Sequence, residues 1–322
     1  MAKHLRSLMD QTYKKLEVIL VDDGSTDGTL GIIEQHVPLL EGCGYIVKVI
    51  SQENGGQSSA INTALKHFSG EFLTWEDPDD WLAADSIQKR LAFLKSHPSA
   101  AFVRSNMAIV SEETGEECGT FEPREREEAW LMKDFFRRLL LGGTWFAPGS
   151  VLVRSEIFIE IYPERDIYVS KPAGQNYQLL LPFAYSYECW QMPEVLSYYL
   201  LRNSSHSHSV RSSAERLAYY EMCRDVSLHV IRHIGVPGIY EELVENRYAV
   251  MYMDLALEGG DKATIRRYWK HLKENKSTPV RVKMRYYLRA FVVPTSLWNL
   301  YAKVRFKVRR LCRAVLKKLA KV

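Results

Sequence analysis

Three aspartates crowd into a short stretch, EDPDDW, that follows an apolar run near residue 75. Asp77, Asp79 and Asp80 stand around a single proline. Carboxylates this close repel one another and are costly to desolvate, so such a cluster lies in solvent or holds a cation. Binding of a divalent ion is the chemistry that this spacing offers. A solvated turn before the next helix is the alternative for the motif taken alone.

Two further polar loops precede this one and have the same setting. DDGSTDGT follows the apolar run at 17–21, and QENGGQSS follows the run at 45–51. Each loop leads into a segment with helical spacing, at 30–40 and 60–68. Strand, loop and helix therefore alternate, which predicts an α/β fold with a mainly parallel sheet and helices on both faces. All three loops are expected at the carboxyl ends of strands, where such sheets bind ligands.

Together, the three loops indicate a site for a nucleotide diphosphate. Adjacent glycines let a ligand approach the backbone, and carboxylates at the same edge can bind ribose or base and hold a divalent ion on phosphates. A helix-capping turn explains DDGSTDGT alone, but not three such loops in order on successive strands. The residues expected at this edge are Asp22, Asp23, Asn54, Gly55, Gly56, Asp77, Asp79 and Asp80.

At this point the chain resembles the family 2 glycosyltransferases of the GT-A (Rossmann-like) fold, of the bacterial surface-polysaccharide type. The matching stretches are QTYKKLEVILVDDGSTDGT, QENGGQSSAINTAL and GEFLTWEDPDDWL, in the order and spacing typical of the family. The resemblance implies that Asp23 and Asp22 contact the base and Asp77 the ribose. It also implies that Asp79, with a smaller part for Asp77, holds a Mn²⁺ or Mg²⁺ ion on the two phosphates.

The same resemblance predicts an additional strand before the helix AKHLRSLMDQ, ending in a Pro-x-Tyr-Asn type loop. The sequence begins almost inside that helix. In this fold the additional strand lies in the interior of the sheet. We therefore expect a transferase domain that lacks its first strand, either through a misassigned start codon or because the chain is a fragment.

The general base is the least determined part of the predicted site. Family members commonly carry a Glu-Asp pair at the start of a helix, whereas this chain has Gln175 and Asn176 near that place. Amides cannot accept a proton near neutral pH, so these two residues are expected to orient a sugar or phosphate. Spacing does not choose among the nearby carboxylates Asp166, Glu164 and Glu188, of which Asp166 is the preferred candidate.

A late histidine is a further candidate ligand. By the same resemblance, His208 or His206 could reach back to the metal or the diphosphate. The alternative is a flexible polar loop with two solvated histidines.

The composition is that of an ordinary globular protein, with 46% hydrophobic and 25% charged residues among 322. Five scattered cysteines show neither a disulfide framework nor zinc-ligand spacing, so a reducing cytosol is the expected setting. Neither a signal peptide nor a membrane-spanning run is expected, because the sequence has no sufficiently long apolar stretch.

Charge and periodicity predict three regions: a transferase domain at 1–210, a helical region at 211–276 and a basic tail at 277–322. No acidic residue follows Glu274, whereas 14 lysines and arginines do. From Leu297 to Leu319 the apolar residues form one stripe of a basic amphipathic helix. We expect this tail to bind an anionic membrane surface, with self-docking or an oligomer contact as the alternative. Nucleic acid is disfavoured because no recognition fold accompanies the charge.

The sequence thus predicts a metal-dependent, inverting glycosyltransferase at the inner face of the cell membrane. It would move a sugar from a nucleotide diphosphate sugar to a glycan or lipid-linked acceptor, in the synthesis of a cell-surface polysaccharide. The alternative is a catalytically inactive nucleotide-binding or scaffold protein of the same fold, favoured by the absent strand and the two amides. A nucleotidyltransferase would share the sheet and the metal chemistry, but it would show a Gly-rich basic loop near its start.

Overall fold

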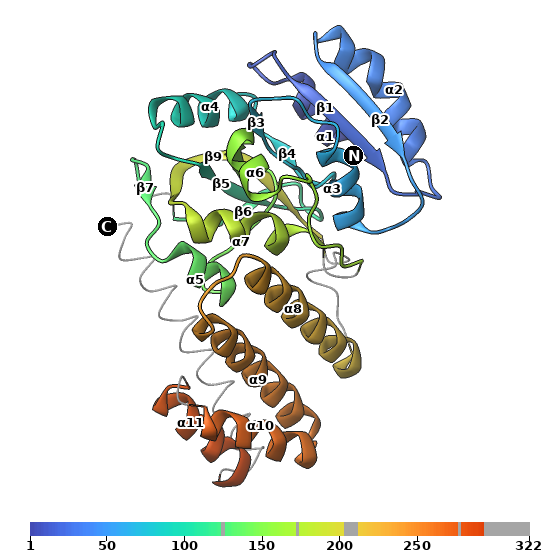
Figure 1. Cartoon of the computed structure of the whole chain (residues 1–322). Helices are drawn as coiled ribbons and strands as arrows, with labels where there is room; N and C mark the ends of the chain where they lie inside the picture. The colour runs from blue at the N-terminus through green and yellow to red at the C-terminus, as the bar shows by residue number, and fades with distance from the viewer. Residues whose placement is uncertain (124–125, 172–173, 203–211, 276–277, 293–322) are drawn as a thin grey trace, which may run out of the picture. The chain divides into compact units, whose positions relative to one another are not determined.

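The computed structural model describes residues 1–123, 126–171, 174–202, 212–275 and 278–292. The chain divides into two compact units (Figure 1). The first unit comprises Met1–Ser212 and Glu221–Glu241, and the second comprises Ser213–Tyr220 and Glu242–Val322. The predicted stripe from Leu297 to Leu319 lies outside the described residues, as does His208.

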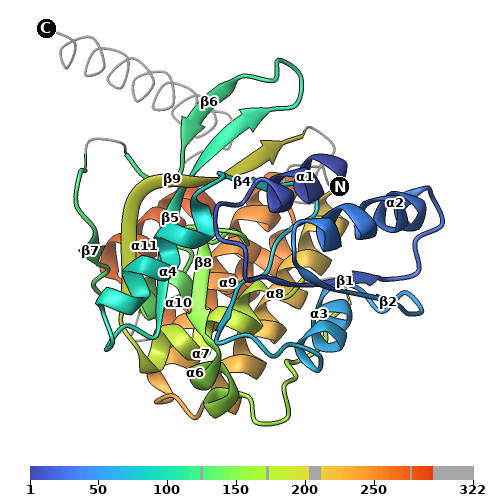
Figure 2. The same ribbon diagram turned by 90° about the horizontal axis from the view of Figure 1, so that it is seen from above.

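A parallel pair of strands opens the first unit. Strands β1 (Glu17–Asp22) and β2 (Ile46–Ser51) run side by side in register, with Asp22 opposite Ser51. They are linked by α2 (Thr29–Gly42), and α3 (Gln57–Leu65) follows β2. The two helices cover opposite faces of the pair (Figure 2). The predicted strand–loop–helix alternation is therefore confirmed here, and it brings the loops after both strands to one edge.

The larger sheet of the first unit has seven strands in the order β3-β8-β5-β9-β4, with β6 on β5 and β7 on β9. Among the described strands of this sheet, β5 and β9 pair in parallel and the other pairs are antiparallel. The strands are β3 (Phe72–Leu73), β4 (Trp81–Leu82), β5 (Phe102–Ser111), β6 (Glu117–Thr120), β7 (Trp130–Leu131), β8 (Val151–Arg154) and β9 (Cys189–Leu201).

The α/β fold class is confirmed, but the expectation of a mainly parallel sheet is wrong for this larger sheet. A buried apolar run has the same appearance in either direction, because both faces of the strand are covered. Helices cover this sheet on both sides, with α4 on one and α6 and α7 on the other (Figure 1). Their bounds are α4 (Ser86–Ser96), α6 (Ser155–Ile161) and α7 (Asn176–Ser186).

Two predicted elements of the first unit are shorter than expected. Apolar spacing over 127–141 predicts one helix, but β7 and the short helix α5 (Phe135–Leu140) stand there instead. Asp134, at the N-cap of α5, has φ = 53°, a left-handed conformation that interrupts a helix. The apolar run over 71–75, which precedes the acidic cluster, predicts a strand of five residues, but only Phe72 and Leu73 pair.

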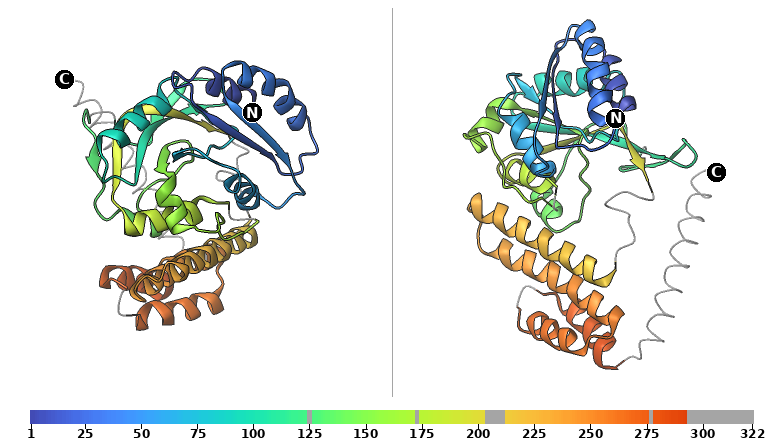
Figure 3. Two further views of the ribbon diagram at one scale, coloured as in Figure 1. Left: turned by 45° about the horizontal axis from the view of Figure 1, so that its top comes forward. Right: turned by 90° about the vertical axis from the view of Figure 1, so that its right-hand side faces the viewer.

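The second unit is helical, which agrees with the periodicity after residue 211. It holds α9 (Ile239–Gly259) from Glu242 onward, α10 (Lys262–Glu274), α11 (Val280–Tyr287) and a π-helical turn η1 (Leu288–Val292) (Figure 3). Helix α8 (Ser213–His233) contributes its first eight residues to this unit and the rest to the first. Met253, Leu272 and Tyr286 form the centre of the helical core. No described helix is long and apolar enough to span a membrane.

Candidate active site

The acidic cluster lies between β3 and β4, in the loop that connects the end of one strand to the start of the other. Asp77, Asp79 and Asp80 each place one carboxylate oxygen within 4.8 Å of the other two. The amide N–H of Leu200, in β9, donates to Asp80 Oδ1 at 2.9 Å. The guanidinium of Arg202, directly after β9, forms an ion pair with Asp79. Residues at the end of β9, which are distant in the sequence, therefore hold two of the three carboxylates in place.

Burial and mutual repulsion change the protonation of two of these groups. Desolvation, followed by the charge of Asp79, raises the pKa of Asp77 to about 6 even though the Gln175 side chain donates it a hydrogen bond. Desolvation raises the pKa of Asp80 to about 8 against the hydrogen bond from Leu200, and neighbouring carboxylates add to the rise. The raised pKa values mean that the negative charges of the cluster are not fully neutralised by the protein. A bound cation would neutralise them.

The donor set fits a divalent cation of the magnesium or manganese type. Three carboxylates are hard oxygen ligands, which both ions prefer, and Asp80 Oδ2 is a buried oxygen without a hydrogen-bond partner among the described residues. The Arg202 guanidinium supplies a positive charge to Asp79 through their ion pair. Predicted ligands Asp79 and Asp77 are thus brought together, and Asp80 joins them.

The residue before the cluster is also a buried carboxyl group. Desolvation raises the pKa of Glu76 to about 7, although the charge of nearby Arg90 opposes this. Arg90 is fully buried in α4, and its Nη1 donates to the carbonyls of Gly149 and Val151, both at 3.0 Å. A side chain at Gly149 would lie 2.2 Å from Glu76 Oε2, so glycine allows this close approach. These contacts join the loop before β8 to the loop that carries the acidic cluster.

Asp23 organises the glycine loop after β2. Its Oδ1 accepts hydrogen bonds from the Gly55 amide at 2.9 Å and the Gln52 side chain at 2.6 Å. Its Oδ2 accepts from the Gly56 amide at 2.8 Å. The structure therefore brings Asp23, Gly55 and Gly56 together as predicted. It also shows that Asp23 holds the loop, a role that the sequence pattern did not indicate.

The glycine loop is fastened to the segment before α7. Lys171 Nζ donates to the carbonyl of Asn54 at 2.7 Å, and a side chain at Gly56 would lie 2.8 Å from the Lys171 carbonyl. One turn into α3, Asn62 exchanges two hydrogen bonds with the backbone of Ile167, at 2.9 and 2.8 Å. The segment that leads to Gln175 is therefore held against α3.

Several buried oxygens of the predicted site residues have no hydrogen-bond partner among the described residues. They are Asp22 Oδ1 at the end of β1, Gln175 Oε1, Asn176 Oδ1 and Asp80 Oδ2. Buried polar atoms are nearly always bonded, so an unpartnered group at the edge of a sheet indicates that a ligand or water completes it. The predicted residues Asp22, Gln175 and Asn176 are thus available for a polar ligand.

The three candidate bases stand on two different segments of the first unit. Glu188 precedes β9 and stands at the opposite end of that strand from Leu200, so the structure does not bring it to the cluster. Asp166 and Glu164 are exposed in the segment between α6 and α7. Asp166 adjoins Ile167, which is bound to α3. His208 lies outside the described residues.

Sequence reasoning missed Arg202, Glu76 and the part that Asp80 plays. Arg202 stands 123 positions from its partner Asp79, and no local pattern marks such a pairing. Asp80 was visible as the third acid of the motif, but its burial depends on the contact with β9. Glu76 ends an apolar run, which was a usable signal for a buried carboxyl group.

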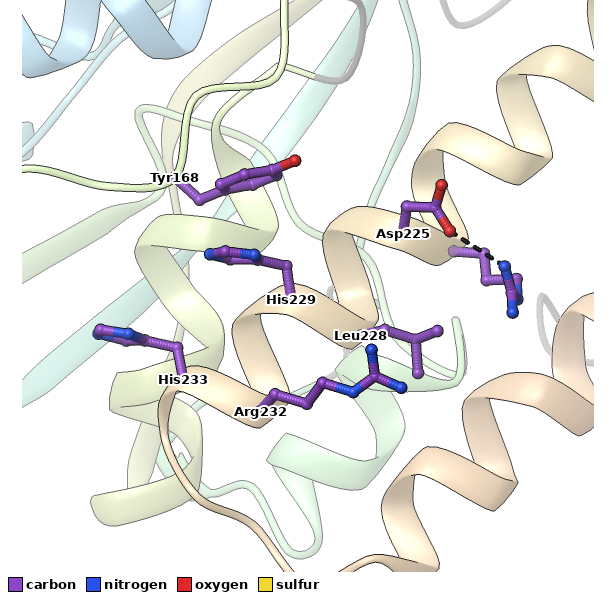
Figure 4. Close-up of a pocket in the computed structure, with 7 residues that line it drawn as sticks. Tyr168, Asp225, Leu228, His229, Arg232 and His233 are labelled. Atoms are coloured by element: carbon purple, nitrogen blue, oxygen red, sulfur yellow. Dashed lines mark hydrogen bonds and ion pairs between the residues drawn. The ribbon is translucent and has the colours of Figure 1, made fainter.

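A separate concave site of about 640 Å³ lies on α8 within the first unit (Figure 4). The ring of Tyr168 stacks on His229, with ring centroids 3.7 Å apart. No residue of the acidic cluster or of the glycine loop lines this cavity. Its lining residues are Tyr168, Arg224, Asp225, Leu228, His229, Arg232 and His233.

Comparison with solved structures supports the fold. TarS of Staphylococcus aureus, in the form 1-349, superposes with a TM-score of 0.56 at 20% sequence identity. The match covers 87% of this chain and 77% of that one. At this identity the likeness concerns the fold alone, which is of the GT-A type.

Sequence comparisons point to one family. The putative glycosyltransferase EpsE of Bacillus subtilis is 25% identical over 240 residues, which is 73% of this chain and 81% of EpsE. An uncharacterized glycosyltransferase of Haemophilus influenzae is 24% identical over 290 residues, or 81% of this chain and 82% of that protein. The putative teichuronic acid biosynthesis glycosyltransferase TuaG of B. subtilis is 33% identical over 109 residues, or 34% of this chain and 42% of TuaG.

The family model described as "Glycosyl transferase family 2" matches residues 1–161. This range holds the glycine loop, the acidic cluster and β8, and it amounts to half of the chain. The chain is a glycosyltransferase and belongs to glycosyl transferase family 2.

Proposed function

We propose that the chain transfers a sugar from a nucleotide diphosphate sugar to a glycan or lipid-linked acceptor, with inversion at the anomeric carbon. The observation that carries this proposal is the cluster of three carboxylates with Arg202 paired to Asp79, together with unpartnered polar atoms in the cluster, at the end of β1 and at the start of α7. That set suits a diphosphate with its counter-ion. A loop with a purely structural role would not need three clustered carboxylates and unpartnered buried oxygens.

In this proposal Asp22 binds the nucleotide base, and Asp77 binds the ribose. Asp23 acts through the glycine loop, since its carboxylate already accepts three hydrogen bonds. Gly55 and Gly56 let the donor approach the backbone, and Asn54 borders the same loop. Gln175 and Asn176 orient the sugar or the phosphates through their free amide oxygens.

Asp79, Asp77 and Asp80 would hold Mn²⁺ or Mg²⁺, and Arg202 would move from Asp79 to the phosphates. When bound, the ion would neutralise the charge of the leaving diphosphate. The base that takes the acceptor proton is assigned to Asp166, with Glu164 as the alternative. Both are exposed on a segment that is tied to α3, whereas Glu188 lies at the far end of β9.

The names of the relatives support a role in cell-surface polysaccharide synthesis. TuaG is named for teichuronic acid biosynthesis, and S. aureus TarS is named as a poly(ribitol-phosphate) beta-N-acetylglucosaminyltransferase. By this analogy we propose an acceptor that is a glycan or a lipid-linked chain. The basic tail would bring the enzyme to the inner face of the membrane.

The decisive test is binding and transfer with a panel of nucleotide sugars, with and without Mn²⁺, measured by calorimetry and by product formation. Asp79→Asn should retain the fold yet abolish Mn²⁺-dependent binding of a nucleoside diphosphate, because a neutral amide is a much weaker ligand than a carboxylate. The matched control is Asp85→Asn, a partly exposed aspartate paired with Lys89, which should leave binding unchanged.

Metal-dependent affinity that survives in Asp79→Asn would contradict the assigned site. Nucleotide binding without any transfer or donor hydrolysis would favour the inactive, nucleotide-binding alternative. The amides at Gln175 and Asn176 are the observation that keeps this second reading in view.

A further inference from the structure

The last described helical segment carries an apolar face that the described residues leave uncovered. Five large apolar side chains of α11 and η1 are between 45% and 77% exposed. Val280, Met284 and Tyr287 recur at spacings of four and three, so they share one side of the helix. The five residues, called here the α11 face, are Val280, Met284, Tyr287, Phe291 and Val292.

The orientation of α11 is fixed by contacts on its other side. Tyr286 is buried in the core of the second unit, and its hydroxyl donates to Asp254 at 2.7 Å. Arg289 also forms an ion pair with Asp254. The α11 face therefore points away from the core because of specific bonds, and its exposure is not that of a frayed end.

Aromatic rings extend the α11 face onto α10. Trp269 contacts Tyr287 and Phe291, with ring centroids 5.7 and 5.9 Å apart, and those two rings are themselves 5.9 Å apart. Tryptophan and tyrosine are the side chains that prefer the boundary between lipid headgroups and acyl chains, since they are apolar bodies with a polar atom.

Positive charge surrounds this surface. Residues 262–292 contain ten lysines and arginines and a single acidic residue, Glu274. Arg281 and Arg285 are exposed on α11 beside the apolar side chains. A surface that is at once apolar, aromatic and cationic matches the chemistry of an anionic bilayer.

Two other occupants fit this surface less well. The phosphates of a nucleic acid could pair with the lysines and arginines, but a nucleic acid would bury little of the apolar surface of the α11 face. A second copy of the chain, docked through the same surface, would bring like charges face to face, which opposes association.

We propose that the α11 face docks the chain on an anionic lipid surface, with its apolar side chains entering the acyl boundary and Arg281 and Arg285 meeting lipid phosphates. Docking lies within the second unit. It rests on the membrane role proposed above for the basic tail at 277–322, and it names the described residues that would make the contact. It does not require the acidic cluster, so the two proposals can fail separately.

The test is flotation of the full-length protein with vesicles of phosphatidylglycerol and phosphatidylcholine, compared with phosphatidylcholine alone. Binding is expected only with the anionic vesicles at low salt. Met284→Ser with Phe291→Ser should weaken partitioning at least about tenfold, because two large apolar side chains are lost from the acyl boundary. The matched control is Leu39→Ser with Ile46→Ser, which removes apolar side chains of the first unit that are 52% and 62% exposed and should leave partitioning unchanged.

The electrostatic contribution has its own pair of variants. Arg281→Gln with Arg285→Gln should weaken partitioning about fivefold for each charge removed. Lys66→Gln with Lys95→Gln removes two exposed charges of the first unit and should have little effect. Hydrolysis of a soluble nucleotide sugar should continue in all four variants, which separates this result from any failure of the catalytic proposal.

Partitioning that is unchanged in Met284→Ser with Phe291→Ser, while circular dichroism shows an intact fold, would overturn the proposal and assign any membrane binding to another segment. Self-association that this variant abolishes, in a protein that ignores anionic vesicles, would overturn it in favour of a second copy.

Discussion

Asp80 gives the metal-free protein a pH response opposite to that of a salt-bridged carboxylate. Its pKa is raised to about 8 by burial, so between about pH 4 and 8 the native state holds a proton that the unfolded state has released. Stability should therefore fall as pH rises through this window, by up to about 1.4 kcal/mol per pH unit for one full proton.

Urea unfolding between pH 5.5 and 8 in the presence of a chelator measures this effect. Asp80→Asn is neutral at every pH and can still accept the Leu200 hydrogen bond, so its stability should change less with pH. An unchanged slope in Asp80→Asn would assign the effect to the other buried carboxyls, Glu76 and Asp77.

Gln175 is expected to tune the neighbouring carboxylate. Its side chain donates a hydrogen bond to Asp77 and so opposes the rise in that pKa. In Gln175→Ala the pKa of Asp77 should rise further, and Mn²⁺-dependent nucleotide binding should weaken most below about pH 7, where Asp77 then holds its proton. Asn176→Ala is the comparison, since its amide oxygen is free. Equal loss of binding at pH 6 and pH 8 would speak against this role.

At the residue scale, the sequence was informative where chemistry is local. A cation site at Asp77 and Asp79 could be proposed because close carboxylates lie in solvent or hold a cation, and the family resemblance assigns the ion to Asp79. Arg202 could not be placed, because its contact with Asp79 depends on how β9 lies against β4. The same dependence hid the burial of Asp80, whose oxygen is bonded by an amide of β9.

The glycine loop after β2 offers a test at the scale of an element. Gly56 has φ = 86°, and a side chain there would meet the Lys171 carbonyl at 2.8 Å. Gly56→Ala should therefore cost about 1 to 3 kcal/mol of stability and weaken nucleotide binding, since the loop and the segment before α7 must move apart. Thermal unfolding and calorimetric binding measure the two effects.

Gly31→Ala is the matched control for this substitution. Gly31 lies inside α2 with no atom near the position of a side chain, so alanine should stabilise the helix by about 0.5 to 1 kcal/mol. A Gly56→Ala protein as stable as the native one would show that the loop relaxes without cost.

Element type could be predicted best where apolar periodicity and turn residues agree, as for β1, α2 and β2. It failed over 127–141, where apolar spacing indicates one helix. The backbone there turns at Asp134 in a conformation that periodicity does not record. The direction of the strands in the larger sheet could not be predicted either, because it depends on pairing between segments that are far apart in the sequence.

At the scale of the whole molecule, the two units should respond differently to a ligand. The acidic cluster and the glycine loop belong to the first unit, and the second has its own helical core. A nucleoside diphosphate with Mn²⁺, at one hundred times its dissociation constant, should stabilise the first unit by about 2.7 kcal/mol. Calorimetry should show one transition that moves with ligand and one that does not. A single transition that moves as a whole would mean that the units unfold together.

The hydrogen bond between Leu200 and Asp80 also has a consequence during synthesis. Its partners are 120 residues apart in the sequence. At about 5 to 20 residues per second, the ribosome makes Leu200 about 6 to 24 s after Asp80. From the synthesis of β5 until that of β9, β5 has no β9 beside it and presents an open strand edge, which is a template for aggregation. The nascent chain should therefore be most dependent on chaperones just before its thirteen-residue strand β9 emerges.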